Sequence, residues 1–130
     1  MKHMFFVALL LLSVGKLLAG FDISICDSID SKGFCKGKSD IFHYTGDRMK
    51  LQVLVHNKEM LGTSKIRYKL YLMKNDREGE ISAELSSDTK PEWFAIVKKL
   101  YFFKPGYYRL DVFKADNTEI GSVFFTLSDR

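Results

Sequence analysis

The sequence predicts an all-β domain, a sandwich or barrel of about seven strands, on three grounds. Apolar residues recur with a period of two in several separate segments, which gives each segment one apolar face. Clusters of Gly, Asn, Asp and Pro separate these segments at intervals of about ten residues. No stretch after residue 20 sustains a helical period, so helices are not expected to build the core.

Seven segments are predicted to form strands. Five alternate clearly between apolar and polar residues: 49–56, 66–73, 81–86, 108–113 and 123–127. Residues 21–26 form a sixth, with Phe21, Ile23 and Ile25 on one face. Residues 93–103 form the seventh, which is apolar on both sides and interrupted by Lys98 and Lys99. Charges at such a place protect a sheet edge against aggregation, and a bend or bulge is the alternative.

The first nineteen residues have the pattern of a signal peptide. Lys2 supplies a basic start, residues 4–12 carry no charge, and small residues follow. Lys16 interrupts the apolar run short of the roughly 20 residues that a spanning helix needs, so export with cleavage is favoured over a retained anchor. Cleavage is expected after Gly15, Ala19 or Gly20. The remaining chain, residues 20–130, is expected to form one domain.

A lipoprotein signal would place a cysteine directly after a small residue. The first cysteine is Cys26, which follows Ile25 and lies late in the chain. We therefore expect no lipid anchor and no stable membrane span after cleavage.

The charge of the exported chain is nearly balanced. The whole sequence has 20 basic and 16 acidic residues, a net charge of +4. Cleavage after Ala19 removes two lysines, Lys2 and Lys16, and leaves 18 bases against 16 acids, or +2. Nucleic-acid-binding domains usually carry a concentrated basic excess, so nucleic acid is not the expected partner.

The two cysteines, Cys26 and Cys35, are predicted to form a disulfide. An even number of cysteines in an exported chain favours this, and the polar residues 27–34 between them can turn back. A redox-active pair is the alternative, but such pairs usually lie only two residues apart. The bond is expected to be a structural one, in an oxidising compartment such as the periplasm or the extracellular space.

One segment resembles the turn and strand of immunoglobulin-like domains. Residues 103–112 read Phe-Lys-Pro-Gly-Tyr-Tyr-Arg-Leu-Asp-Val, and Tyr108 matches the tyrosine of the tyrosine corner. The resemblance implies an immunoglobulin-like antiparallel β-sandwich, in which the Tyr108 hydroxyl bonds to backbone just upstream. Leu110 stands where antibody-type domains have a cysteine, so only bacterial or fibronectin-like sandwiches are comparable. Tyr108 as a simple inward-facing aromatic residue is the alternative.

No motif in the sequence indicates catalysis, a metal site or a cofactor. His43 and His56 lack the spacing of zinc ligands. Residues 27–33 loosely resemble a calcium loop but lack its third acid and its terminal Glu. No phosphate loop or catalytic set is marked, so we expect no enzyme activity, no metal and no cofactor.

The surface offers one candidate for partner binding. Lys65, Arg67, Lys69 and Tyr71 alternate with Ile66, Tyr68 and Leu70, so the first four share the outer face of one strand. We call these four residues the basic stripe. It could bind an acidic partner, and the alternative is an ordinary solvated face.

The sequence thus favours a non-enzymatic exported module that binds a protein or a component of the cell envelope, through its loops, an open sheet edge or the basic stripe. The alternative is a small lipocalin-like β-barrel that carries an apolar ligand, which would require a closed barrel around a cavity.

Overall fold

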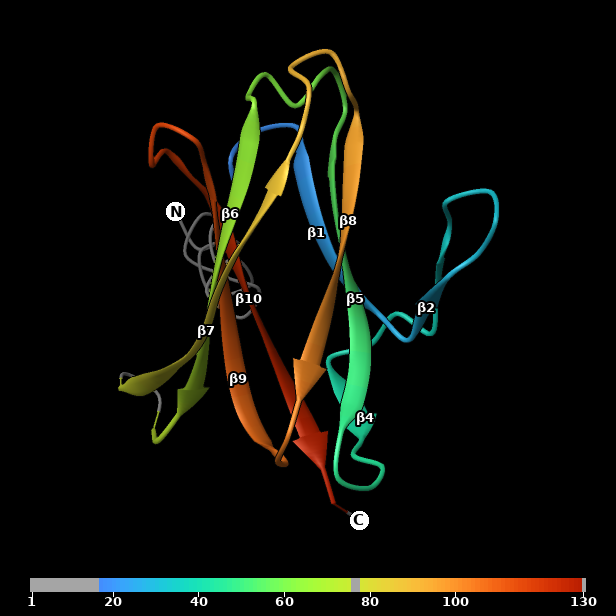
Figure 1. Cartoon of the computed structure of the whole chain (residues 1–130), viewed down its shortest axis with the longest axis vertical. Coiled ribbons are helices and arrows are strands. Elements are labelled where there is room, and N and C mark those ends of the chain that lie inside the picture. The colour runs from blue at the N-terminus through green and yellow to red at the C-terminus, as the bar shows by residue number, and fades with distance from the viewer. Residues whose placement is uncertain (1–16, 76–77, 130) are drawn as a thin grey trace, which may run out of the picture.

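The computed structural model describes residues 17–75 and 78–129, and this part of the chain contains ten strands and no helix (Figure 1). The strands are β1 (Phe21–Cys26), β2 (Ser28–Ile29), β3 (Cys35–Lys36), β4 (Ile41–His43), β5 (Met49–Asn57), β6 (Lys65–Met73), β7 (Gly79–Asp88), β8 (Ala95–Phe102), β9 (Gly106–Lys114) and β10 (Glu119–Ser128).

Two open sheets face each other, as a sandwich requires. One sheet has three strands in the order β1-β5-β8, and the other has five in the order β4-β10-β9-β6-β7. All neighbouring strands are antiparallel except β4 and β10, which are parallel. The two-stranded hairpin β2-β3 projects to one side of the sandwich (Figure 1).

The core lies between the two sheets and is filled by the inward-facing residues of both. It contains three aromatic rings, Phe102, Tyr108 and Phe125, whose centroids lie 5.0 to 5.7 Å apart. Around them lie fully buried aliphatic residues from both sheets, among them Leu51 and Leu110. Burial of this apolar surface is the main driving force for the fold.

All seven predicted strands are present, as β1, β5, β6, β7, β8, β9 and β10. The three short strands β2, β3 and β4 were not predicted, because two or three residues are too few to show a period. The strand predicted over residues 93–103 is shorter, since β8 begins at Ala95 and ends at Phe102. Trp93, Phe94 and Phe103 flank it in exposed loops, which explains why the segment looked apolar on both sides.

β8 is an edge strand of the three-stranded sheet, and it carries the lysines that the sequence indicated as protection of a sheet edge against aggregation. The Lys98 ammonium donates a 3.0 Å hydrogen bond to the carbonyl oxygen of Ser86 on β7, the edge strand of the opposite sheet. An inward-pointing lysine at an edge discourages the addition of another strand.

Residues 1–16, which hold most of the predicted signal peptide, lie outside the described residues. Within the described ranges, no helix has the length and apolar character needed to cross a bilayer. The structure of the predicted domain, residues 20–130, contains all ten strands.

Candidate functional site

The basic stripe lies on β6, the fourth strand of the five-stranded sheet, and its four side chains point away from the core. Ile66, Tyr68 and Leu70, which alternate with them, are buried. The stripe is therefore part of the outer face of this sheet, as the alternation predicted.

Side chains of β7 and of the β9–β10 turn contact the first two cations of the stripe. The Lys65 ammonium lies 3.8 Å from a carboxylate oxygen of Asp88 on β7. The Arg67 guanidinium donates a hydrogen bond to the side-chain oxygen of Asn117.

Lys69 has an acid on each side. Its cross-strand partners are Glu84 on β7 and Asp111 on β9, and its ammonium lies 5.5 Å from the centre of the Phe113 ring. Directly opposed residues on one face of a sheet lie close enough to interact. Among the described residues, Lys65 is the stripe cation within ion-pair distance of a carboxylate, and Lys69 lies opposite two acids without a direct ion pair.

Asp111 and Arg109, on β9, are the most tightly held charges of this face. Asp111 is buried, and one of its carboxylate oxygens accepts a 2.7 Å hydrogen bond from the Ser122 hydroxyl. The Arg109 Nε lies 3.1 Å from the same oxygen. Within the described residues this Nε is buried and makes no well-aligned hydrogen bond, so the contact is an ion pair.

An aromatic and cationic row crosses the outer face next to this pair. Phe124 of β10, Arg109 of β9, Tyr71 of β6 and Ile81 of β7 are successive cross-strand neighbours. The Arg109 guanidinium lies 4.3 Å from the centre of the Tyr71 ring. The Tyr107 ring stacks on Phe124 with a centroid separation of 5.8 Å.

We call these five residues the outer row: Tyr107, Phe124, Arg109, Tyr71 and Ile81. Its two ends are open to solvent, because Ile81 is 57% exposed and Tyr107 is 39% exposed. Of the outer row, the sequence identified only Tyr71. The alternation of Tyr107, Arg109, Asp111 and Phe113 with buried residues was the signal that could have located the rest of the face.

A shallow groove of about 240 Å³ lies beside the row, between β6 and β7. Its lining includes Arg67, Lys69, Glu84 and Ser86. Within residues 17–75 and 78–129, no group of three or more His, Cys, Asp or Glu side chains gathers as a metal site would require. The arrangement on this face suits binding through rings and a guanidinium.

The geometry of a tyrosine corner is found at Tyr108. Its hydroxyl donates a 2.8 Å hydrogen bond to the carbonyl oxygen of Lys104. Burial raises the pKa of Tyr108, and the nearby Tyr44 adds a smaller effect in the same direction. Gly106 lies between Lys104 and Tyr108 in the sequence and has a φ of +153°. A Cβ at this position would come within 2.6 Å of the Leu72 side chain. The β8–β9 turn is therefore fixed both by its own backbone and by Tyr108.

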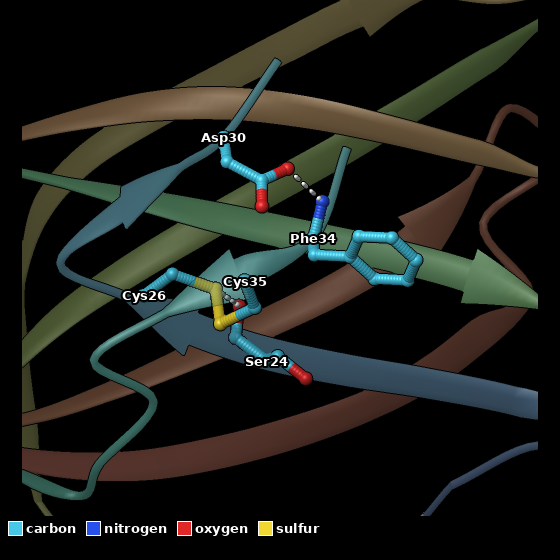
Figure 2. Close-up of a disulfide and its surroundings, with 5 residues drawn as sticks. All are labelled: Ser24, Cys26, Asp30, Phe34 and Cys35. Atoms are coloured by element: carbon cyan, nitrogen blue, oxygen red, sulfur yellow. Dashed lines mark hydrogen bonds between the residues drawn. A yellow bond between two sulfur atoms is a disulfide. The ribbon is translucent and has the colours of Figure 1, made fainter. Parts of the chain in front are cut away.

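The predicted disulfide is confirmed, and Figure 2 shows it at the base of the β2-β3 hairpin. Cys26 ends β1 and Cys35 begins β3, with their Cα atoms 5.5 Å apart. Asp30 orders the turn, because one carboxylate oxygen accepts 2.9 Å hydrogen bonds from the amides of Lys32 and Phe34. A bond that closes a loop this short stabilises the fold by about 2–3 kcal/mol in the chain-entropy model.

Comparisons with solved structures show that the sandwich is immunoglobulin-like. The chain is similar to the PmoD soluble domain from Methylocystis sp. (Rockwell), with a TM-score of 0.54 and 7% identity, over 90% of this chain and 98% of that one. It is also similar to an immunoglobulin-like protein (PA1606) from Pseudomonas aeruginosa, with a TM-score of 0.50 and 12% identity, over 88% and 96% of the two chains. No protein-family model and no curated protein matches the sequence. At these identities the likeness shows the fold alone, and it confirms the predicted immunoglobulin-like sandwich.

Proposed function

We propose that this chain is a non-enzymatic binding module that works outside the cytoplasm and recognises a protein partner through the outer face of its five-stranded sheet. The observation that carries this proposal is the outer row, which presents three rings, a guanidinium and Ile81 close together across four strands. Aromatic residues and arginine are the side chains most enriched at protein interfaces.

The open sandwich favours this function over that of a lipocalin-like carrier. A carrier of an apolar ligand would need a closed barrel around a cavity, whereas both sheets here end in free edge strands. The space between the sheets is occupied by buried side chains such as Phe102, Tyr108 and Phe125. Recognition by a surface is therefore the simpler use of this fold.

The disulfide supports a place outside the cytoplasm. Structural disulfides persist in oxidising compartments and are rare in the reducing cytosol. Cys26 is fully buried and bonded to Cys35, which is consistent with an exported soluble domain, periplasmic or extracellular.

We expect the partner to present a surface that complements this face, with apolar side chains and with both acidic and basic groups. The prediction of an acidic partner rested on three like charges in a row, whereas in the fold Lys69 lies opposite Glu84 and Asp111 and Lys65 lies opposite Asp88. A partner that carried only acidic groups would also meet these three carboxylates.

A capture experiment with matched variants tests the proposal. The full chain serves as bait for an envelope extract, in wild-type form and as Tyr71→Ser/Ile81→Ser, which removes the middle and one end of the outer row. Val97→Ser is the control, because Val97 is an exposed apolar residue of the other sheet. Quantitative mass spectrometry should identify an envelope protein that is captured by the wild type and by the control, but not by the double variant. Capture that both variants retain, or that both lose, contradicts the proposal.

A further inference from the structure

A second surface, at the end of the sandwich where the C-terminus lies, exposes two aromatic rings. Phe103, in the turn after β8, is 70% exposed, and Tyr101, on the outer side of β8, is 43% exposed. Phe102 between them is buried and packs edge-on against Tyr108 at 5.0 Å. The alternation that buries Phe102 therefore turns its two neighbours outward. Figure 1 shows this turn at the lower end of the molecule, beside the β4–β5 loop.

The exposed ring of Phe103 stands on a fixed turn. The Tyr108 hydroxyl donates a hydrogen bond to the carbonyl oxygen of Lys104, the residue after Phe103, and so holds the backbone there in place. Gly106 closes the turn. Phe103 is thus presented to solvent by an ordered piece of backbone. Exposed apolar side chains at such positions are a common mark of a binding surface.

Four cations surround the two rings. The Arg48 guanidinium lies 4.8 Å from the centre of the Tyr101 ring, and Lys50 is the cross-strand neighbour of Tyr101. Lys99 precedes Tyr101 on the same face of β8, and Lys104 follows Phe103. We call these six residues the basic corner: Arg48, Lys50, Lys99, Tyr101, Phe103 and Lys104.

None of the strand cations of the basic corner has an acid as its cross-strand neighbour, whereas Lys65 and Lys69 of the basic stripe do. In the described part of the chain, no carboxylate lies within ion-pair distance of any of the four. Lys104 contributes to lowering the pKa of Glu80, but the Lys74 ammonium is the main cause and makes the direct contact, at 2.9 Å. Asp47 is the acid next in sequence to Arg48, and its side chain is in an exposed loop. The corner therefore carries a clear excess of positive charge.

We propose that the basic corner docks the protein peripherally on an anionic phospholipid surface. The cations would lie among the lipid headgroups, while Phe103 enters the boundary between headgroups and acyl chains. Each Lys or Arg near such a surface contributes roughly a five-fold gain in binding. A buried aromatic ring adds apolar contact that a soluble polyanion cannot provide. The proposal does not depend on the outer row, which lies on the other sheet.

The opposite end of the sandwich provides an internal contrast. It also exposes three large apolar side chains: Met60, Trp93 and Phe94. Its β5–β6 and β7–β8 loops, however, together carry two bases and two acids: Lys58, Glu59, Lys90 and Glu92. Because these charges cancel, this end offers apolar contact without attraction to an anionic surface, and it supplies the control variants.

Vesicle co-sedimentation tests the proposal. Each variant is expressed from the full sequence and purified after any processing by the cells. Intact-mass measurement then verifies that all variants have the same N-terminus. The probe is vesicles of phosphatidylglycerol and phosphatidylcholine in equal parts, compared with phosphatidylcholine alone. The variants are Lys50→Glu/Lys99→Glu and Phe103→Ser, and the control is Lys58→Glu/Lys90→Glu. Unfolding midpoints establish that each variant is folded.

The wild type should bind the anionic vesicles, and added salt should weaken this binding. Lys50→Glu/Lys99→Glu should lower it by at least an order of magnitude, about five-fold for each charge removed. Phe103→Ser should lower it several-fold, and the control should bind as the wild type does. Equal binding to both kinds of vesicle, equal binding by the corner variants and the wild type, or no binding at all would overturn the proposal. Dextran sulfate serves as a soluble polyanion for comparison. The proposal would also be overturned if the protein bound dextran sulfate but not the vesicles, and if Phe103→Ser left the binding to dextran sulfate unchanged.

Discussion

The basic stripe and the basic corner look alike in the sequence and differ in the fold. Both are short sets of lysine and arginine with aromatic residues among them. In the stripe, β7 and β9 bring Asp88, Glu84 and Asp111 opposite the cations. In the corner, β8 is an edge strand with β5 as its only neighbour in the sheet, and no acid of the described residues pairs with the cations. Because Lys50 lies on β5, the middle strand of its sheet, the difference comes from which residues the register places opposite each other.

This difference means that the two regions contribute differently to the fold and to binding. Lys65 and Lys69 of the stripe lie opposite acids on neighbouring strands, so reversing their charge should lower stability. Unpaired charges of the corner contribute little to stability, so changes there should alter binding at constant stability. The predictions that follow test this contrast, from the largest expected effect to the smallest.

Asp111→Ala should have the largest effect, because Asp111 is the buried anion of the outer face. The change removes the acceptor of the Ser122 hydroxyl and the ion-pair partner of Arg109, whose side chain is itself mostly buried. We expect a loss of about 2 kcal/mol in the free energy of unfolding, measured by urea denaturation. Asp47→Ala, in an exposed loop, is the control and should stay near wild type. A loss below about 0.5 kcal/mol would show that the face is not held by this pair.

Tyr68, on the inner side of the strand that carries the stripe, should make the fold sensitive to alkaline pH. Burial raises its pKa from 10.0 to about 12, and a hydrogen bond with Ser87 opposes this only weakly. The unfolded chain releases this proton near pH 10 and the folded chain does so near pH 12, so stability falls as the pH rises between these values. The loss attributable to Tyr68 approaches about 2 kcal/mol at the upper end.

Comparison with Tyr68→Phe isolates this effect from the titration of lysines, which both proteins share. The difference in unfolding free energy between wild type and variant should shift in favour of the variant from pH 9 to pH 12. A difference that stays constant over this range would show that the Tyr68 hydroxyl is not shielded from solvent.

Tyr108→Phe should cost about 1 kcal/mol, the usual net contribution of one hydrogen bond. The change removes the bond to the Lys104 carbonyl oxygen and retains the ring between Phe102 and Phe125. Because this bond fixes the turn of the basic corner, hydrogen exchange at the Lys104 and Gly106 amides should also accelerate. An unchanged unfolding midpoint together with unchanged exchange would show that Tyr108 matters only through packing.

The sequence predicted the strands well because period two is a local property. Met49, Leu51, Val53 and Val55 occupy every second position of one segment, so the buried face of β5 can be read without any knowledge of its neighbours. The tyrosine corner was predictable for the same reason, since Tyr108 and its acceptor on Lys104 are four residues apart.

The pairing of charges could not be predicted, because it depends on which strands are neighbours and in what register. Lys69 and Glu84 are fifteen positions apart and Lys69 and Asp111 are forty-two apart, and only the order β9-β6-β7 brings them together. A register shift between Leu70 and Tyr71 then sets Ile81 beside Tyr71, with no signal in the sequence. The stripe therefore looks uniformly basic in the sequence, whereas in the fold two of its three cations lie opposite acids.

The central claim, that lysines of the stripe lie opposite acids and those of the corner do not, is tested most directly by reversing one lysine in each. Lys69→Glu places a third carboxylate between Glu84 and Asp111, whereas Lys99→Glu faces the neutral Gln52. In urea denaturation at low salt, Lys69→Glu should lose on the order of 1 kcal/mol, and salt should reduce this loss. Lys99→Glu should stay within about 0.5 kcal/mol of wild type. Equal losses in the two variants, or a larger loss in Lys99→Glu, would contradict the account.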